Sequence, residues 1–148
     1  MNYSMINYIV GWILGVEAAL MVPSVIVSAI YRESSGWALV ATILLCLILC
    51  FPLVRKQPKN KVLYAREAAV IVALSWIIMS FMGALPFYFS GEIPHLVDAL
   101  FETVSGFTTT GASILSSPAD MSNGLMFWRC FTHWVGGMGV LVFLLCLL

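Results

Sequence analysis

Long runs of apolar residues, separated by short polar segments, dominate the pattern along the chain. Four such runs cover residues 5–30, 37–54, 68–89 and 124–148, and the second and third contain no charged residue. Each is close to the roughly 20 apolar residues that an α-helix needs to cross the hydrocarbon core of a bilayer. The pattern therefore predicts an all-α membrane protein with about four transmembrane helices.

The polar segment between the third and fourth runs has a pattern of its own. Pro94 is suited to the start of a helix, and apolar residues follow at helical spacing as far as Phe107. A helix of roughly eight to thirteen residues is too short to span a bilayer. Residues 108–111, Thr-Thr-Thr-Gly, then combine β-branched residues that favour an extended backbone with a permissive glycine. We expect a short re-entrant pore helix followed by an extended filter segment.

Backbone carbonyls in such a loop can replace the water shell of a monovalent cation. The predicted potassium ligands are the carbonyl oxygens of four consecutive residues: Thr108, Thr109, Thr110 and Gly111. The short helix would point its partly negative C-terminus at the ion. Asp98 and Glu102, one turn apart on that helix, would raise the cation concentration at the outer mouth. Thr-Thr-Thr-Gly also occurs in ordinary external loops, so the pattern alone leaves both interpretations open.

The composition agrees with a membrane protein and argues against other classes. The chain of 148 residues is 61% hydrophobic and 9% charged, with a mean hydropathy of +1.01. A soluble domain carries about a quarter charged residues. The net charge is zero, so nothing indicates nucleic acid as a partner. The sequence contains no nucleophile–base pair, phosphate loop or metal-ligand motif, and an enzyme is therefore not predicted.

The basic residues predict the orientation in the membrane. Five of the seven lie close together: Arg55, Lys56, Lys59, Lys61 and Arg66. The positive-inside rule places the 55–66 loop and the N-terminus in the cytoplasm. Residues 90–123, with the pore loop, would then be external in a multi-pass protein of the cell (inner or plasma) membrane. The basic loop is either an orientation signal alone or also a contact for anionic lipid or a regulatory partner.

A few polar residues within the apolar runs allow two interpretations. Glu17 is costly in lipid unless it is paired, and we interpret it as a polar contact between helices, with a functional role as the alternative. His133 is predicted to hydrogen-bond a neighbouring helix, with pH sensing as the alternative. Arg129 is expected either to reach the membrane interface or to pair with an acidic side chain: Asp98, Glu102 or Asp120.

Three glycines in the fourth run, Gly136, Gly137 and Gly139, would allow close packing of helices. A gating bend at these glycines is the alternative interpretation.

Two longer motifs carry a family resemblance. Residues 98–112 (DALFETVSGFTTTGA) closely resemble the first pore loop of the Trk/Ktr/HKT superfamily of cation transporters, and most of all its TrkH-like branch. Residues 127–140 (FWRCFTHWVGGMGV) resemble the helix that follows this loop in the same family. The two motifs stand in the order that the family requires, so together they are more specific than Thr-Thr-Thr-Gly alone.

The resemblance implies four helix–pore loop–helix repeats in one polypeptide around a single potassium pathway. Residues 1–57 would be two leading transmembrane helices, and residues 62–148 the first repeat. By resemblance, Thr109 and Thr110 supply carbonyls to the ion, Thr108 and Gly111 flank them, and glycine at position 111 accompanies potassium preference. Members of the family are homodimers that bind a cytoplasmic nucleotide-binding regulatory subunit.

The expected function is potassium uptake across the cytoplasmic membrane, with the potassium ion as the bound cargo. The chain departs from the family in length, because three repeats are missing and the last apolar run has no polar tail. We therefore interpret it as part of a longer reading frame. The alternatives are a non-conducting truncated fragment or membrane scaffold and, third, a small cation channel built from four copies.

Overall fold

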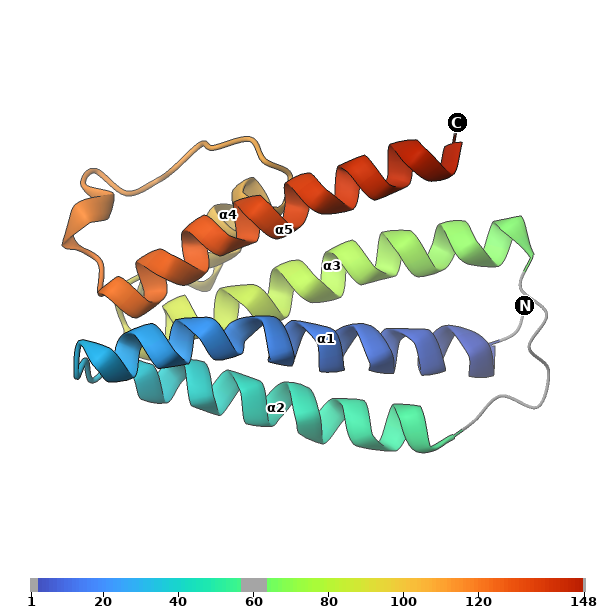
Figure 1. Cartoon of the computed structure of the whole chain (residues 1–148), viewed down its shortest axis with the longest axis horizontal. Helices are drawn as coiled ribbons and strands as arrows, with labels where there is room; N and C mark the ends of the chain where they lie inside the picture. The colour runs from blue at the N-terminus through green and yellow to red at the C-terminus, as the bar shows by residue number, and fades with distance from the viewer. Residues whose placement is uncertain (1–2, 57–63, 148) are drawn as a thin grey trace.

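This computed structural model describes residues 3–56 and 64–147, and every secondary-structure element in them is a helix (Figure 1). At residues 65, 118 and 140–147 only the backbone is described. The elements, in chain order, are α1 (Tyr3–Ile30), α2 (Gly36–Arg55), α3 (Ala65–Ser90), α4 (Leu96–Phe107), the 3₁₀ turn η1 (Pro118–Asp120) and α5 (Asn123–Leu147). The described part contains no strand, which confirms the predicted all-α class.

Four of the helices are long enough to cross a bilayer. At about 1.5 Å per residue, α1, α2, α3 and α5 measure roughly 42, 30, 39 and 38 Å, against a hydrocarbon core of about 30 Å. By length and composition, three described segments qualify as spans: Tyr3–Ile30, Gly36–Arg55 and Arg66–Ser90. The four helices begin and end within three residues of the predicted runs. The short α4, at 12 residues, cannot span.

The long helices run side by side along the molecule, and α4 lies against α3 and α5 near one end (Figure 1). One buried cluster takes side chains from all five helices, and it includes Met21, Leu39, Phe87, Phe107 and Trp128. Because Phe107 is the last residue of α4, this core fixes the end of the short helix inside the bundle.

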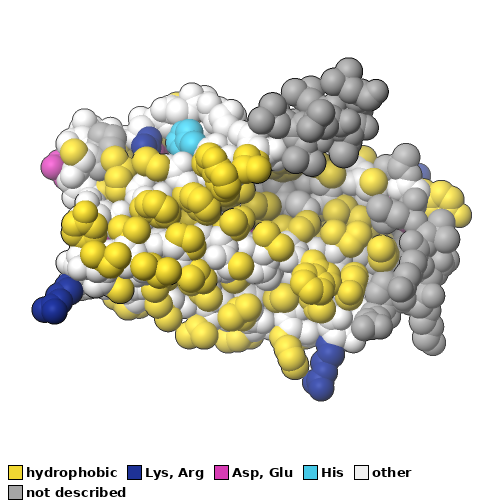
Figure 2. Space-filling view, in the orientation of Figure 1, with side chains coloured by type: hydrophobic (Ala, Val, Ile, Leu, Met, Phe, Trp, Pro, Cys, Tyr) yellow, Lys and Arg dark blue, Asp and Glu magenta, His cyan; other side chains and the backbone are white. Residues whose placement is uncertain are grey.

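Apolar side chains also cover much of the surface, as Figure 2 shows for one face. Ile48, Ile77 and Val97 are 67%, 66% and 77% exposed. Most of the Lys and Arg side chains visible on this face stand at its two ends. Exposed apolar surface of this extent marks a membrane or protein interface.

The predicted basic loop at residues 55–66 is described only in part, because Lys59 and Lys61 lie outside the described residues.

A carboxylate from the loop between α1 and α2 holds the start of α5. Glu33 accepts hydrogen bonds from the backbone N–H and the side-chain amide of Asn123, both at 2.8 Å, and from the Gly124 N–H at 3.0 Å. Burial alone would raise the pKa of Glu33, but these hydrogen bonds outweigh it, and the pKa lies below its ordinary value. A negative charge here also complements the positive end of the α5 dipole.

Candidate ion-binding site

The predicted pore loop begins where α4 ends, and a hydrogen-bonded turn closes that end. The Thr109 N–H donates to the Gly106 carbonyl at 2.9 Å, and the Thr110 N–H donates to the Ser105 carbonyl at 3.0 Å. Thr109 has a left-handed backbone with φ of 57°. These two bonds around a left-handed residue form the Schellman motif, which commonly ends helices.

The backbone therefore differs from the expected extended segment at its first two residues. Thr108 has φ −82° and ψ 1°, and Thr109 is left-handed. A β-branched residue rarely adopts positive φ, so the threonine preference for extended backbone is overridden by hydrogen bonding at the helix end. Gly111 has φ of 77°, as expected for the permissive residue of the loop.

This turn leaves carbonyl oxygens without protein donors. Within the described part of the chain, no hydrogen bond ends on the carbonyls of Thr109, Thr110 or Gly111. The Thr108 carbonyl accepts the Thr109 hydroxyl at 2.7 Å. All four residues are exposed, and they lie at the C-terminus of α4, where the helix dipole is negative. Such an arrangement can attract and coordinate a cation.

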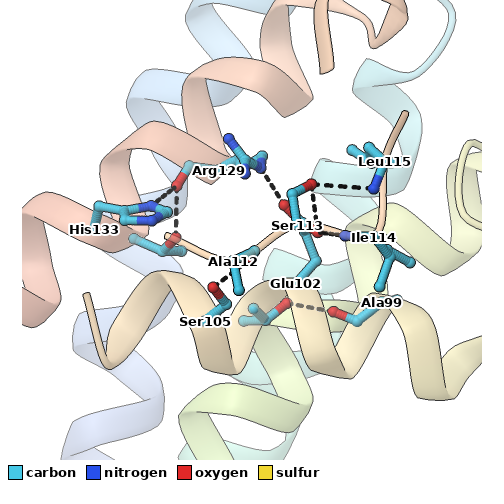
Figure 3. A network of polar contacts seen from close by, with 11 residues as sticks. Ala99, Glu102, Ser105, Ala112, Ser113, Ile114, Leu115, Arg129 and His133 are labelled. Carbon is cyan, nitrogen blue, oxygen red and sulfur yellow. Dashed lines mark hydrogen bonds and ion pairs between the residues drawn. The ribbon is translucent and has the colours of Figure 1, made fainter. Parts of the chain in front are cut away.

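The chain that leaves the loop is fastened back onto α4 (Figure 3). The Ser105 hydroxyl donates to the Ala112 carbonyl at 2.5 Å. The Ser113 hydroxyl and the Ile114 N–H both donate to Oε2 of Glu102, at 3.1 and 3.2 Å. The segment that follows residues 108–111 is therefore tied back to the pore helix.

Glu102 has a different place from the one expected of an outer-mouth acid. Its side chain is 1% exposed, and its Oε1 forms an ion pair with Nε of Arg129 on α5. Of the acidic partners considered for Arg129, the structure selects Glu102. Because α4 and α5 pack closely here, Arg129 neutralises the charge of Glu102. The buried carboxylate therefore does not face the outer mouth. Asp98, one turn earlier, is half-buried at the start of α4.

Close packing of α5 supports the end of α4. A Cβ at Gly136 would overlap the Phe107 carbonyl group, and a Cβ at Gly106 would overlap the Thr132 hydroxyl. Gly137 and Gly139 have no such contact: a Cβ at Gly137 would lie 3.8 Å from the nearest atom, and at Gly139 nothing lies within 4 Å. Among the three glycines expected to allow close packing, only Gly136 makes such a contact with the residues that the structure describes.

Trp128 is a supporting residue that the sequence did not single out for the site. Its indole N–H donates to the Gly83 carbonyl on α3 at 3.0 Å, and its ring meets Phe107 edge to face, with centroids 6.5 Å apart. Trp128 is fully buried. Composition alone cannot separate a core tryptophan from an interfacial one. The position of Trp128 in the family motif at residues 127–140 was the sequence feature that could have indicated its supporting role.

Two expectations about polar residues in the spans are corrected. His133 contacts the Arg129 carbonyl of its own helix, Nδ1 to oxygen 3.0 Å, instead of a neighbouring helix, because the carbonyl one turn earlier is within reach. Glu17 was interpreted as a polar contact between helices, but neither of its carboxylate oxygens has a hydrogen-bond partner in the described structure.

Comparison with known proteins identifies the family. The profile of a family described as TrkH, cation transport protein, matches residues 36–147, which is most of the chain. The chain belongs to the TrkH family. This confirms the family resemblance seen in the sequence.

Relatives in this family match the whole chain. The Trk system potassium uptake proteins TrkH of Salmonella typhimurium and Escherichia coli K12 are each 36% identical over 100% of this chain. A crystal structure of the potassium transporter TrkH from Vibrio parahaemolyticus superimposes with a TM-score of 0.92 at 29% identity, over 99% of this chain and 32% of that one. The chain spans 31% of the length of the two curated relatives.

Proposed function

We propose that this chain is the front part of a TrkH-type potassium uptake pore and contributes one of the four loops of its filter. The proposal depends on the hydrogen bonding observed at the end of α4. The amides of Thr109 and Thr110 are used in the helix cap, while residues 109–111 are exposed and their carbonyls accept no hydrogen bond from the residues that the structure describes. Carbonyl oxygens at the negative end of a helix suit a dehydrated monovalent cation.

Within this proposal, Thr109 and Thr110 are the main ligands, and Thr108 and Gly111 flank them. The Thr108 carbonyl is engaged by a hydroxyl group, which supports its lesser role. Asp98 remains the candidate outer-mouth acid. Glu102 instead positions the loop, since its carboxylate holds the segment that leaves residues 108–111.

The proposed division is two leading helices in residues 1–57 and a first helix–pore loop–helix repeat in residues 62–148. The N-terminus and the 55–66 loop would be cytoplasmic, and residues 90–123 would be external. Arg55, Lys56 and Arg66 are exposed at the end of the bundle away from the pore loop, which supports this orientation (Figure 1). Homodimer formation and a cytoplasmic nucleotide-binding subunit belong to the same proposal.

The exposed side of α4 supports a pore completed by further repeats. Val97, Phe101 and Val104 follow one another at helical spacing and are 77%, 46% and 38% exposed. Beside them lies an apolar groove of about 360 Å³, with Trp76 and Thr108 among its lining residues. A pore helix surrounded by neighbouring repeats would cover this stripe, and one loop alone cannot surround an ion.

A chimera tests the proposal. This chain would replace the matching segment of the Escherichia coli TrkH relative, and the chimera would be expressed in a strain that cannot take up potassium. We expect growth at low external potassium to be restored. A chimera that reaches the membrane but supports neither growth nor rubidium flux would contradict the proposal and favour a non-conducting scaffold.

The filter assignment has a matched pair of variants in that chimera. Gly111→Ser should weaken discrimination of potassium over sodium in flux assays. Gly91→Ser is the control, because Gly91 also has φ of 77° and open space around its Cβ position, but lies at the end of α3. Equal ion preference in both variants and the parent would exclude Gly111 from the filter.

A further inference from the structure

Glu17 is a buried carboxyl group without a partner. It lies in the middle of α1, its side chain is 0% exposed, and neither Oε1 nor Oε2 has a hydrogen bond in the described structure. Because the side chain is already fully enclosed by this chain, additional segments of a longer protein cannot reach it without opening the bundle. The partner that Glu17 lacks must therefore be small.

The surroundings of Glu17 come from the other helices of the bundle. Its Oε1 lies 3.5 Å from the position that a Cβ would take at Gly83 of α3, and the same point is 2.9 Å from Thr103 and 3.2 Å from Phe107 of α4. On α2, the buried Cys46 packs in the same cluster as Ala18, the residue next to Glu17. Glu17 thus sits behind the last turns of the pore helix.

None of these facing groups carries a positive charge. The Lys and Arg side chains that the structure describes are Arg32, Arg55, Lys56 and Arg66, which lie at or beyond helix ends, and Arg129. Arg129 is paired with Glu102. An unpaired carboxylate in a low-dielectric interior loses several kcal/mol of hydration, whereas a neutral carboxylic acid loses much less. A bound proton is the smallest partner that removes this cost.

We propose that Glu17 is a proton-binding site in the membrane-spanning part of the protein. It holds one proton as a carboxylic acid between α1, α3 and α4. Loss of the proton would leave a bare charge beside Gly83 of α3, in the interior of the bundle near the last turns of α4. Proton binding is thereby linked to the packing of the two leading helices against the pore helix.

Infrared spectroscopy of the chain in lipid bilayers at neutral pH reads this proton directly. With ¹³C-carboxyl glutamate, the five glutamates are distinguished from the two aspartates. We expect one labelled carboxylic acid band that shifts in D₂O and disappears in Glu17→Gln. Glu33→Gln, the control, should remove carboxylate signal and leave the acid band in place. A wild-type spectrum with labelled carboxylate bands only would overturn the proposal. This outcome is read from the wild-type protein alone and does not depend on the folding of any variant.

Thermal unfolding gives a second readout. Glu17→Gln replaces the acid by a neutral group of similar shape, so its melting temperature should match that of the wild type at neutral pH. A bound metal cation in place of the proton would instead make the wild-type melting temperature depend on that cation and Glu17→Gln less stable. Both experiments are independent of transport, so failure of the potassium-pore proposal would leave them unchanged.

Discussion

At the scale of single residues, the loop combines one strained position with one buried ion pair. Thr109 adopts φ of 57°, which costs a β-branched residue on the order of 1–3 kcal/mol. Local hydrogen bonds of the Schellman turn and the fastening of the chain through Ser105 and Glu102 hold it there. The residues that present the carbonyls are therefore kept in place by residues that do not contact an ion.

Glu102→Gln should destabilise the protein because it leaves the Arg129 guanidinium, which is 13% exposed, without its counter-charge. Breaking one side of a buried pair typically costs about 3–5 kcal/mol. Thermal unfolding in detergent would measure the loss. Asp98→Asn, at the half-buried acid one turn earlier, should cost less than about 1 kcal/mol. Similar losses for both variants would show that the ion pair between α4 and α5 does not stabilise the protein.

At the scale of elements, α5 packs against the end of α4 and holds it in place. The contact between Gly136 and the Phe107 carbonyl group leaves no room for a methyl group. Trp128 joins the same region to α3 through the Gly83 carbonyl. The start of α5 is in turn held by Glu33 from the loop between α1 and α2. The leading pair of helices is thus connected to the pore loop through α5.

Gly136→Ala should push α5 away from the end of α4, because the added methyl meets backbone atoms that cannot rotate aside. Overpacking of this kind typically costs about 1–3 kcal/mol, and the melting temperature should fall accordingly. Gly139→Ala is the matched control: it lies in the same helix, no described atom is within 4 Å of its Cβ position, and the change should not be destabilising. A harmless Gly136→Ala would refute the close contact.

Stability should fall in acid because of Glu33. Its pKa is lowered from the ordinary 4.5 in the folded protein, so its contribution is fully present above that value and is lost as the pH falls through the lower folded pKa. Melting temperatures measured between neutral pH and pH values below 4.5 should decline less steeply in Glu33→Gln than in the wild type. Parallel curves would mean that the cap on α5 does not contribute.

At the scale of the whole molecule, the sequence predicts the helices far better than the contacts between them. Apolar runs determine the spans locally, and so the helix bounds follow from residue type and length. The position of Thr-Thr-Thr-Gly after a short helix is likewise local. The left-handed Thr109 is not, because it depends on how α4 is capped and packed.

Contacts between distant segments explain the remaining differences. The sequence left Arg129 with three acidic candidates, and only the approach of α4 to α5 selects Glu102. Glu33 caps α5 by binding Asn123, which lies 90 residues later in the chain. No local sequence pattern indicates this role. Glu17 was expected to have a polar partner, but the helices that enclose it supply none among the described residues.

The central claim is that the carbonyls of residues 109–111 bind the transported ion. Solid-state NMR of the chimera in bilayers, with ¹³C-carbonyl threonine and glycine, tests it most directly. Exchange of sodium for potassium should shift the carbonyl resonances of Thr109 and Thr110, with smaller changes at Thr108 and none at Gly91. Carbonyl resonances at residues 108–111 that are identical in the two ions would contradict the account.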